Sequence, residues 1–126
     1  MMCPEQRNPV LIVEDERVAR RALTALLAGH GYDAKSFDSA EALLEEVEQK
    51  GTEPKVILAD VDLPGMSGLQ MLDKLVQNRP DLQAYLITAA EGEEIEQFCE
   101  SHSCQYLRKP LNLGKLLSLL SDNQAA

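Results

Sequence analysis

The chain has 126 residues, of which 44% are hydrophobic and only 4% aromatic, and its formal net charge is −9. This length suits one domain with a single aliphatic core. The acidic balance argues against direct binding of nucleic acid, which normally needs a basic face. The hydrophobic runs are far shorter than the ~20 residues of a membrane span. Three cysteines without scaffold spacing favour a reducing, cytoplasmic setting.

The first half of the chain alternates apolar runs, which predict strands, with segments whose apolar residues recur at helical spacing. Gly31 ends the first predicted helix, and a capping box over residues 38–41 begins the second. In chain order, the predicted elements are a flexible polar tail over 1–8, a buried strand over 9–13, a helix over 17–30, a weaker edge strand over 32–37 and a helix from residue 40.

The second half begins with a continuous apolar run that ends in Asp60. A run without alternation predicts a strand that is buried on both faces. Ser67 and Asn112 can each cap a following helix. In chain order, the predicted elements are a strand over 56–60, a helix that Pro80 ends, a strand over 84–87, a helix over 91–102, a short strand over 105–107 and a last helix. Residues 122–126 show no pattern and predict a C-terminal tail, so the domain is expected to span 9–121.

Alternation of five strands with five helices predicts an α/β fold with one parallel sheet covered on both faces. The favoured topology at this size is the flavodoxin-like, doubly wound sandwich with strand order 2-1-3-4-5. In that order the first and third strands are neighbours, so their carboxyl ends meet at one edge of the sheet. Ligands bind at this edge in open α/β folds.

Four predicted strands end at this edge in polar residues, which are Glu14 with Asp15, Asp60, Thr88 and Lys109. Three carboxylates so close together repel one another strongly unless a cation is present. An all-oxygen, strongly anionic site suits Mg²⁺. Lys109 adds a fixed positive charge and Thr88 a hydroxyl donor. Together these groups predict a phosphoryl-transfer site with an acidic nucleophile.

Four motifs follow one another, each at the end of a predicted strand. They are Val13-Glu14-Asp15, Asp60-x-x-x-Pro64-x-x-x-Gly68, Thr88-Ala89 and Tyr106-x-x-Lys109-Pro110. Each motif is weak alone, but their order and placement are highly specific. From Pro9 to about Leu120 the sequence resembles the CheY-like receiver domain of two-component response regulators.

The resemblance implies that Asp60 accepts a phosphoryl group from a phosphohistidine of a histidine kinase or a phosphotransfer protein. Asp15 and Asp60 are implied to bind Mg²⁺ directly, Glu14 directly or through water, and Asp62 through its backbone carbonyl. Lys109 is implied to pair with Asp60 and then with a phosphoryl oxygen. Such a domain is not a general enzyme, because it catalyses only its own phosphorylation and dephosphorylation.

The resemblance also implies a conformational switch. Thr88 would hydrogen-bond the phosphoryl group, and Tyr106 would move into the space that Thr88 leaves. The surface of the fourth helix, fifth strand and fifth helix would then change and be read by a downstream protein. With no room for an output domain, we expect either a stand-alone regulator or one domain of a longer protein.

Several positions depart from the commonest receiver pattern. Glu14 stands where an Asp is usual, and Leu111 where an aromatic is frequent. Asp62 and Ala90 occupy the two positions that flank the phosphoryl group in this family and affect its hydrolysis. The usual small residues before the fifth strand are replaced by 102–104. These departures concern phosphate lifetime and the output surface.

Other interpretations remain open for single features. Asp60-Val61-Asp62 has the Asp-x-Asp spacing of the haloacid dehalogenase phosphohydrolases, although that family carries the motif on its first strand. The chain could also be a receiver-like interaction module that is never phosphorylated. Each acid, Thr88 or Lys109 taken alone could be a cap or a surface residue, and Tyr106 a half-buried strand aromatic.

Two further clusters lie outside these motifs. Cys99, His102 and Cys104, with the distant Cys3, have a spacing that can hold zinc, although ordinary buried cysteines are the simpler interpretation. The basic residues of the first helix could dock a kinase beside the acidic site. They are Arg17, Arg20 and Arg21.

Overall fold

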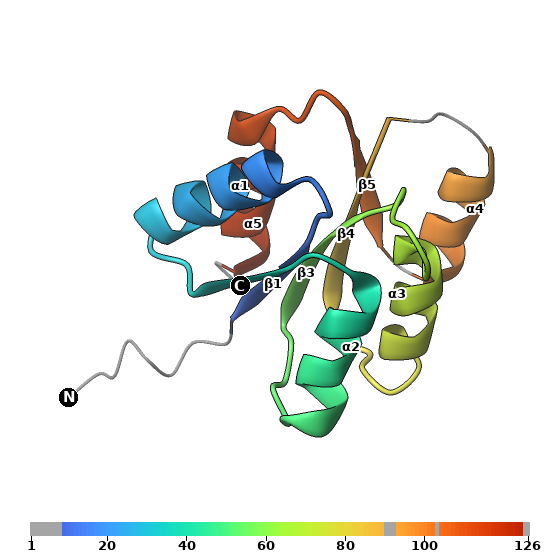
Figure 1. Cartoon of the computed structure of the whole chain (residues 1–126). Coiled ribbons are helices and arrows are strands. Elements are labelled where there is room, and N and C mark those ends of the chain that lie inside the picture. The colour runs from blue at the N-terminus through green and yellow to red at the C-terminus, as the bar shows by residue number, and fades with distance from the viewer. Residues whose placement is uncertain (1–8, 90–92, 103, 125–126) are drawn as a thin grey trace.

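The computed structural model describes residues 9–89, 93–102 and 104–124 (Figure 1). In this part of the chain five strands alternate with five helices, as predicted. The strands are β1 (Val10–Val13), β2 (Ala34–Phe37), β3 (Val56–Asp60), β4 (Gln83–Thr88) and β5 (Gln105–Arg108). The helices are α1 (Arg17–Gly29), α2 (Ala40–Gln49), α3 (Gly68–Val76), α4 (Glu93–His102) and α5 (Leu113–Gln124).

All five strands are parallel and follow the order β2-β1-β3-β4-β5, which confirms the predicted topology. Figure 1 shows α1 and α5 on one face of the sheet and α2, α3 and α4 on the other. The chain therefore forms three layers. The carboxyl ends of β1, β3 and β4 lie next to one another at one edge of the sheet.

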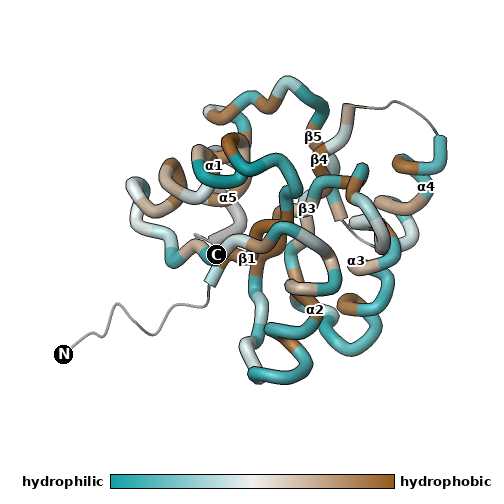
Figure 2. The backbone as a smooth tube through the Cα atoms, viewed as in Figure 1, coloured by the Kyte–Doolittle hydropathy of each residue, from teal (hydrophilic) through white to brown (hydrophobic). Residues whose placement is uncertain are grey.

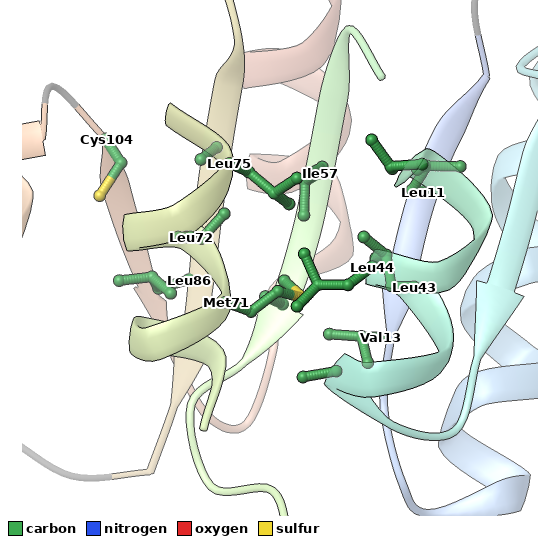
Figure 3. Close-up of a cluster of buried hydrophobic side chains, with 14 of the residues drawn as sticks. Leu11, Val13, Leu43, Leu44, Ile57, Met71, Leu72, Leu75, Leu86 and Cys104 are labelled. Carbon is green, nitrogen blue, oxygen red and sulfur yellow. The ribbon is translucent and has the colours of Figure 1, made fainter. Parts of the chain in front are cut away.

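Successive side chains of a strand point to opposite faces, so each central strand supplies both halves of the core. Leu11 packs among residues of α2 and α3, whereas its neighbour Ile12 packs among residues of α1 and α5. Figure 3 shows the first of these clusters between the helices and the sheet. Figure 2 shows hydrophobic residues along the strands at the centre of the molecule. Each fully buried Leu or Ile contributes about 1.5–3 kcal/mol, so this core holds β1 and β3 firmly in place.

The boundaries of some elements differ from those predicted. β2 begins at Ala34 instead of residue 32, because Tyr32 donates its backbone N–H to the Leu27 carbonyl in the turn that ends α1. Gly31, with φ of 90°, makes this turn possible. α5 continues to Gln124, three residues into the segment assigned to the C-terminal tail. Each further residue adds one backbone hydrogen bond once a helix is formed, and no helix breaker stops it here.

The predicted tail over 1–8 lies outside the described residues, and so do Cys3, Ala90 and Ser103. Within the described part of the chain, no helix combines the length and the hydropathy that a membrane span requires.

Candidate functional site

Three carboxylates meet at the carboxyl edge of the sheet. β1 and β3 pair with Val13 beside Ala59, so the residues that follow, Glu14 and Asp60, lie level with each other. Oxygens of Glu14, Asp15 and Asp60 lie within 4.8 Å of one another. Glu14 and Asp60 are 8% and 2% exposed, whereas Asp15 faces solvent. The convergence that was expected from the strand order is therefore present.

Lys109 completes the group. Among the described residues, it is the one cation that forms an ion pair with any of these three acids. Its Nζ donates to Asp60 Oδ2 at 2.8 Å. Its backbone N–H donates to the Thr88 carbonyl at 2.8 Å, which fixes the start of the β5–α5 loop on β4. The hydrogen bond to Asp60 is the main cause that raises the pKa of Lys109 above its ordinary value. The lysine is therefore held as an ammonium at neutral pH.

The backbone after β3 fixes the other oxygen of Asp60. The N–H of Asp62 donates to Asp60 Oδ1 at 2.9 Å, while the side chain of Asp62 is exposed. The N–H of Val61 donates to the Ile87 carbonyl at 3.0 Å. Both oxygens of a nearly buried carboxylate thus have a donor, and its orientation is defined.

Gly68 lets helix α3 begin directly against the backbone of Asp60. A Cβ at this position would lie 2.5 Å from the Asp60 carbonyl oxygen. Ser67 caps the helix by accepting from the Gln70 N–H, and the Gln70 side chain accepts from the Ser67 N–H. The predicted cap is confirmed, and the close approach explains why a glycine follows it.

Two contacts that hold the site were not found from the sequence. Glu41, in the first turn of α2, accepts the Met66 N–H at 3.2 Å and so holds the loop after β3. Arg20 Nη1 donates to the Glu14 carbonyl at 3.0 Å. Neither carries a local signal, because both partners meet only in the folded chain. Arg20 thus supports the acidic loop, and only Arg17 and Arg21 of the basic cluster are exposed.

The two predicted switch residues lie on the strands next to β3. Thr88 is the last residue of β4 and fully buried, and Tyr106 is a half-buried residue of β5. Tyr106 pairs with Leu86, two residues before Thr88, so the two side chains lie on the same face of the sheet. The Tyr106 hydroxyl lies 3.5 Å from Glu96 Oε2 on α4. This placement is compatible with the exchange of positions that the switch requires.

A cavity of about 410 Å³ opens beside the acidic residues, between α1 and the β5–α5 loop. Glu14, Glu16 and Lys109 form its polar side. Its apolar lining comes mainly from Ala19, Ala22, Leu23, Ile87, Pro110 and Leu111. The site therefore has an accessible, largely apolar approach from one side.

The charges of the site suit a divalent cation. When ionised, the three carboxylates and the Lys109 ammonium sum to −2. Burial raises the pKa of the Glu14 carboxyl above its ordinary value, and the negative charge of Asp60 adds to this. Clustered carboxylate oxygens are the ligands that Mg²⁺ prefers. The donor set thus fits Mg²⁺.

Replacement of Glu14 by Gln is expected to stabilise the protein in the absence of divalent metal at neutral pH. A carboxyl whose pKa is higher in the folded than in the unfolded state destabilises the fold once it ionises. The advantage of Glu14→Gln should therefore grow as the pH rises from 4.5, the ordinary pKa, towards neutrality. Thermal unfolding in a chelating buffer across this range measures it.

The matched control is Glu45→Gln, which removes one carboxylate from the exposed face of α2. It corrects for the general gain from lowering a net charge of −9. Equal melting temperatures of the Glu14 and Glu45 variants at neutral pH would contradict a destabilising effect of the ionised Glu14 carboxylate.

The alternative zinc site is not supported. His102 Nε2 lies 2.8 Å from Asp73 Oδ1, and its Nδ1 lies 3.0 Å from the Phe98 carbonyl oxygen. Both nitrogens are therefore engaged elsewhere, and neither is directed to a metal ion shared with the cysteines. Among the described residues, Glu14, Asp15 and Asp60 form the one group whose possible metal ligands lie within 4.8 Å. Cys99 and Cys104 are buried, as the simpler interpretation held.

Fold and site together define a class of protein: a signalling domain whose acidic pocket fits a phosphoacceptor site. The family model of the response regulator receiver domain matches residues 10–121. The chain belongs to this family, and the resemblance seen in its motifs is confirmed.

Relatives agree with this assignment. The response regulator protein FleR of Pseudomonas aeruginosa is 37% identical over 116 residues, which cover 89% of this chain and 24% of FleR. A cyclic di-GMP phosphodiesterase of Thermotoga maritima is 33% identical over 108 residues, covering 85% of this chain and 28% of that protein. The chain thus spans about a quarter of the length of these two relatives. The crystal structure of a response regulator receiver protein from Pseudomonas putida is 30% identical with a TM-score of 0.79, covering 92% and 97% of the two chains.

Proposed function

We propose that the chain works as a phosphorylation switch in which Asp60 accepts the phosphoryl group of a phosphohistidine. The observation that carries the proposal is the environment of Asp60. Its carboxylate is nearly buried, has Lys109 at 2.8 Å and lies beside two further acids. Its neighbours Glu14 and Lys109 line a cavity. Such a group is positioned by the fold, and the cavity beside it offers a donor an approach.

In the proposed reaction, an oxygen of Asp60 attacks phosphorus as the phosphorus–nitrogen bond of the donor breaks. The imidazole keeps the electron pair of that bond. Lys109 moves from the Asp60 carboxylate to an oxygen of the transferred group and balances its charge. Positioning and charge neutralisation account for most of the catalysis in phosphoryl transfer.

Asp15 and Asp60 would hold Mg²⁺ directly, Glu14 directly or through water, and Asp62 through its backbone carbonyl. The ion supplies positive charge that offsets the repulsion among the carboxylates and the phosphoryl oxygens. Arg20 and Glu41 position the two loops that carry these ligands. The domain catalyses only its own phosphorylation and dephosphorylation in this scheme.

The donor is a histidine kinase or a histidine phosphotransfer protein. Its surface approaches along α1 and the β5–α5 loop, where the apolar cavity lies next to Lys109. Arg17 and Arg21 are exposed cations of the same helix, whereas Arg20 is engaged with Glu14. An acidic partner surface would complement them.

The output is a change of the surface formed by α4, β5 and α5. Thr88 hydrogen-bonds the phosphoryl group, and the ring of Tyr106 moves towards the space that Thr88 vacates. The 3.5 Å contact of Tyr106 with Glu96 is long, so it offers little resistance to this movement. A downstream protein reads the altered surface, without direct contact of this domain with nucleic acid.

Incubation with Mg²⁺ and a small phosphodonor such as acetyl phosphate tests the proposal. One alkali-labile, hydroxylamine-labile phosphate per chain is expected, and a chelator should abolish its formation. Intact-protein mass spectrometry measures the product. Failure of the wild type to gain this phosphate contradicts the proposal, and so does continuous turnover of small phosphate esters, which indicates the phosphohydrolase alternative.

A further inference from the structure

Two cysteine thiols touch where helix α4 is joined to strand β5. Cys99 lies in α4 and Cys104 directly precedes β5. The thiol of Cys104 donates to the sulfur of Cys99 with the sulfurs 3.4 Å apart. Both side chains are buried, with exposed fractions of 8% for Cys99 and 9% for Cys104. Figure 3 shows Cys104 at the margin of the buried cluster, near Leu72 and Leu86.

The backbone already holds these residues in a position from which a bond can form. The N–H of Cys104 donates to the Cys99 carbonyl at 3.1 Å. A disulfide bond of about 2.05 Å requires the sulfurs to move together by only about 1.4 Å, which side-chain rotation can supply. Buried cysteines are usually inert packing residues. Packing alone does not require two cysteine sulfurs to touch, so their direct contact across the helix–strand connection points to a further role.

We propose that Cys99 and Cys104 form a reversible intramolecular disulfide that fastens the C-terminal end of α4 to the start of β5. The oxidant is a peroxide. Cys99 sulfur attacks one peroxide oxygen, the oxygen–oxygen bond breaks, and water and a sulfenic acid result. Cys104 sulfur then attacks the Cys99 sulfur, its proton leaves with the hydroxyl as a second water, and the two thiols have lost two electrons.

The hydrogen bond between the thiols assigns their order of reaction. Burial raises the pKa of Cys99 above its ordinary value, and the hydrogen bond from the Cys104 thiol, which stabilises a thiolate at Cys99, partly offsets this rise. Burial and the same contact raise the pKa of Cys104 to about 12. The contact thus favours ionisation of Cys99 over that of Cys104, and since the thiolate is the nucleophile, Cys99 reacts with the oxidant and Cys104 resolves the product. In a reducing compartment such a bond is transient and serves regulation.

The crosslink lies beneath the proposed output surface. Tyr106 follows Cys104 by two residues on β5, and its partner Glu96 precedes Cys99 by three residues on α4. A bond between the cysteines therefore limits the movement of α4 relative to Tyr106. This consequence rests on the proposed function, whereas formation of the disulfide does not.

The experiment uses the folded 126-residue chain with Cys3→Ser, so that only Cys99 and Cys104 remain as cysteines. Hydrogen peroxide is added, remaining thiols are alkylated, and the protein is cleaved after Glu100, which lies between the cysteines. The expected result is one peptide pair joined by a disulfide, with the loss of two hydrogen atoms from the intact mass. Dithiothreitol should restore both thiols.

Single variants test the assigned order. In Cys104→Ser, oxidation should stop at a sulfenic acid on Cys99, which dimedone traps. In Cys99→Ser, the remaining Cys104 should react with hydrogen peroxide at least several-fold more slowly than Cys99 does in Cys104→Ser. Asp60→Asn should form the disulfide as completely as the wild type, which separates this proposal from that of phosphorylation. Retention of both thiols, oxidation to sulfinic acids without crosslinking, or bonds between chains only would overturn the proposal.

Discussion

Asp60→Asn is expected to lower phosphoryl uptake from acetyl phosphate by at least about a thousandfold, because the variant lacks the nucleophilic oxygen. Asparagine has nearly the shape of aspartate, so its side-chain oxygen can still accept from the Asp62 N–H or from Lys109. The fold should remain intact, since one of three mutually repelling carboxylates is removed. Mass spectrometry after a fixed incubation measures uptake, and thermal unfolding verifies the fold.

Asp81→Asn is the matched control. Asp81 is exposed before the start of β4, at the edge of the sheet opposite the site. The same chemical change there should leave uptake as in the wild type. A phosphate that persists in the Asp60 variant would assign the nucleophile to another carboxylate, and its position could then be read from peptide fragments.

Gly68→Ala is expected to lower the free energy of unfolding by about 2 kcal/mol or more. The added Cβ would stand 2.5 Å from the Asp60 carbonyl oxygen and 3.2 Å from the Asp60 carbonyl carbon. Both are backbone atoms, so the clash cannot be relieved by rotation of a side chain. Alanine favours a helix by about 0.8–1 kcal/mol over glycine, which is too little to offset the displacement.

The same substitution should slow phosphoryl uptake. Displacement of helix α3 or of β3 shifts Asp60 relative to Lys109, and a shift of about 1 Å can cost about a hundredfold in rate. Chemical denaturation measures stability, and the time course of phosphorylation measures the rate. Together the two effects would show that Gly68 is required for space beside Asp60.

Gly29→Ala serves as the control for the exchange itself. Gly29 ends α1, and a Cβ there would meet nothing within 4 Å. Stability should stay unchanged or rise by up to about 1 kcal/mol. If Gly68→Ala behaved like Gly29→Ala, α3 would be free to move away from Asp60 at little cost.

Much of this protein follows from local features of its sequence. The apolar run that ends in Asp60 predicts a buried strand with an acid at its end, and the alternation of strands and helices predicts a parallel sheet. Handedness and short connections then leave few topologies. Because parallel strands end at one edge, the meeting of Glu14, Asp15, Asp60 and Lys109 could be predicted without coordinates.

Other features depend on side-chain contacts that no local pattern indicates, whether the two partners are near or distant in the chain. No sequence pattern around Glu41 indicates that its side chain accepts a hydrogen bond from the Met66 N–H. None around Arg20 indicates that its side chain donates to the Glu14 carbonyl. The sulfur contact of Cys99 and Cys104 depends on how α4 turns into β5.

The sequence by itself thus determined the elements, the topology and the chemical groups of the site, because hydrophobic periodicity and strand ends are local properties. Only the tertiary structure decided which donor each oxygen of Asp60 receives, why Gly68 cannot carry a side chain, and which helices hold the loops. Those details depend on distances of a few ångströms between separately formed elements, and these distances are set by packing of the whole core.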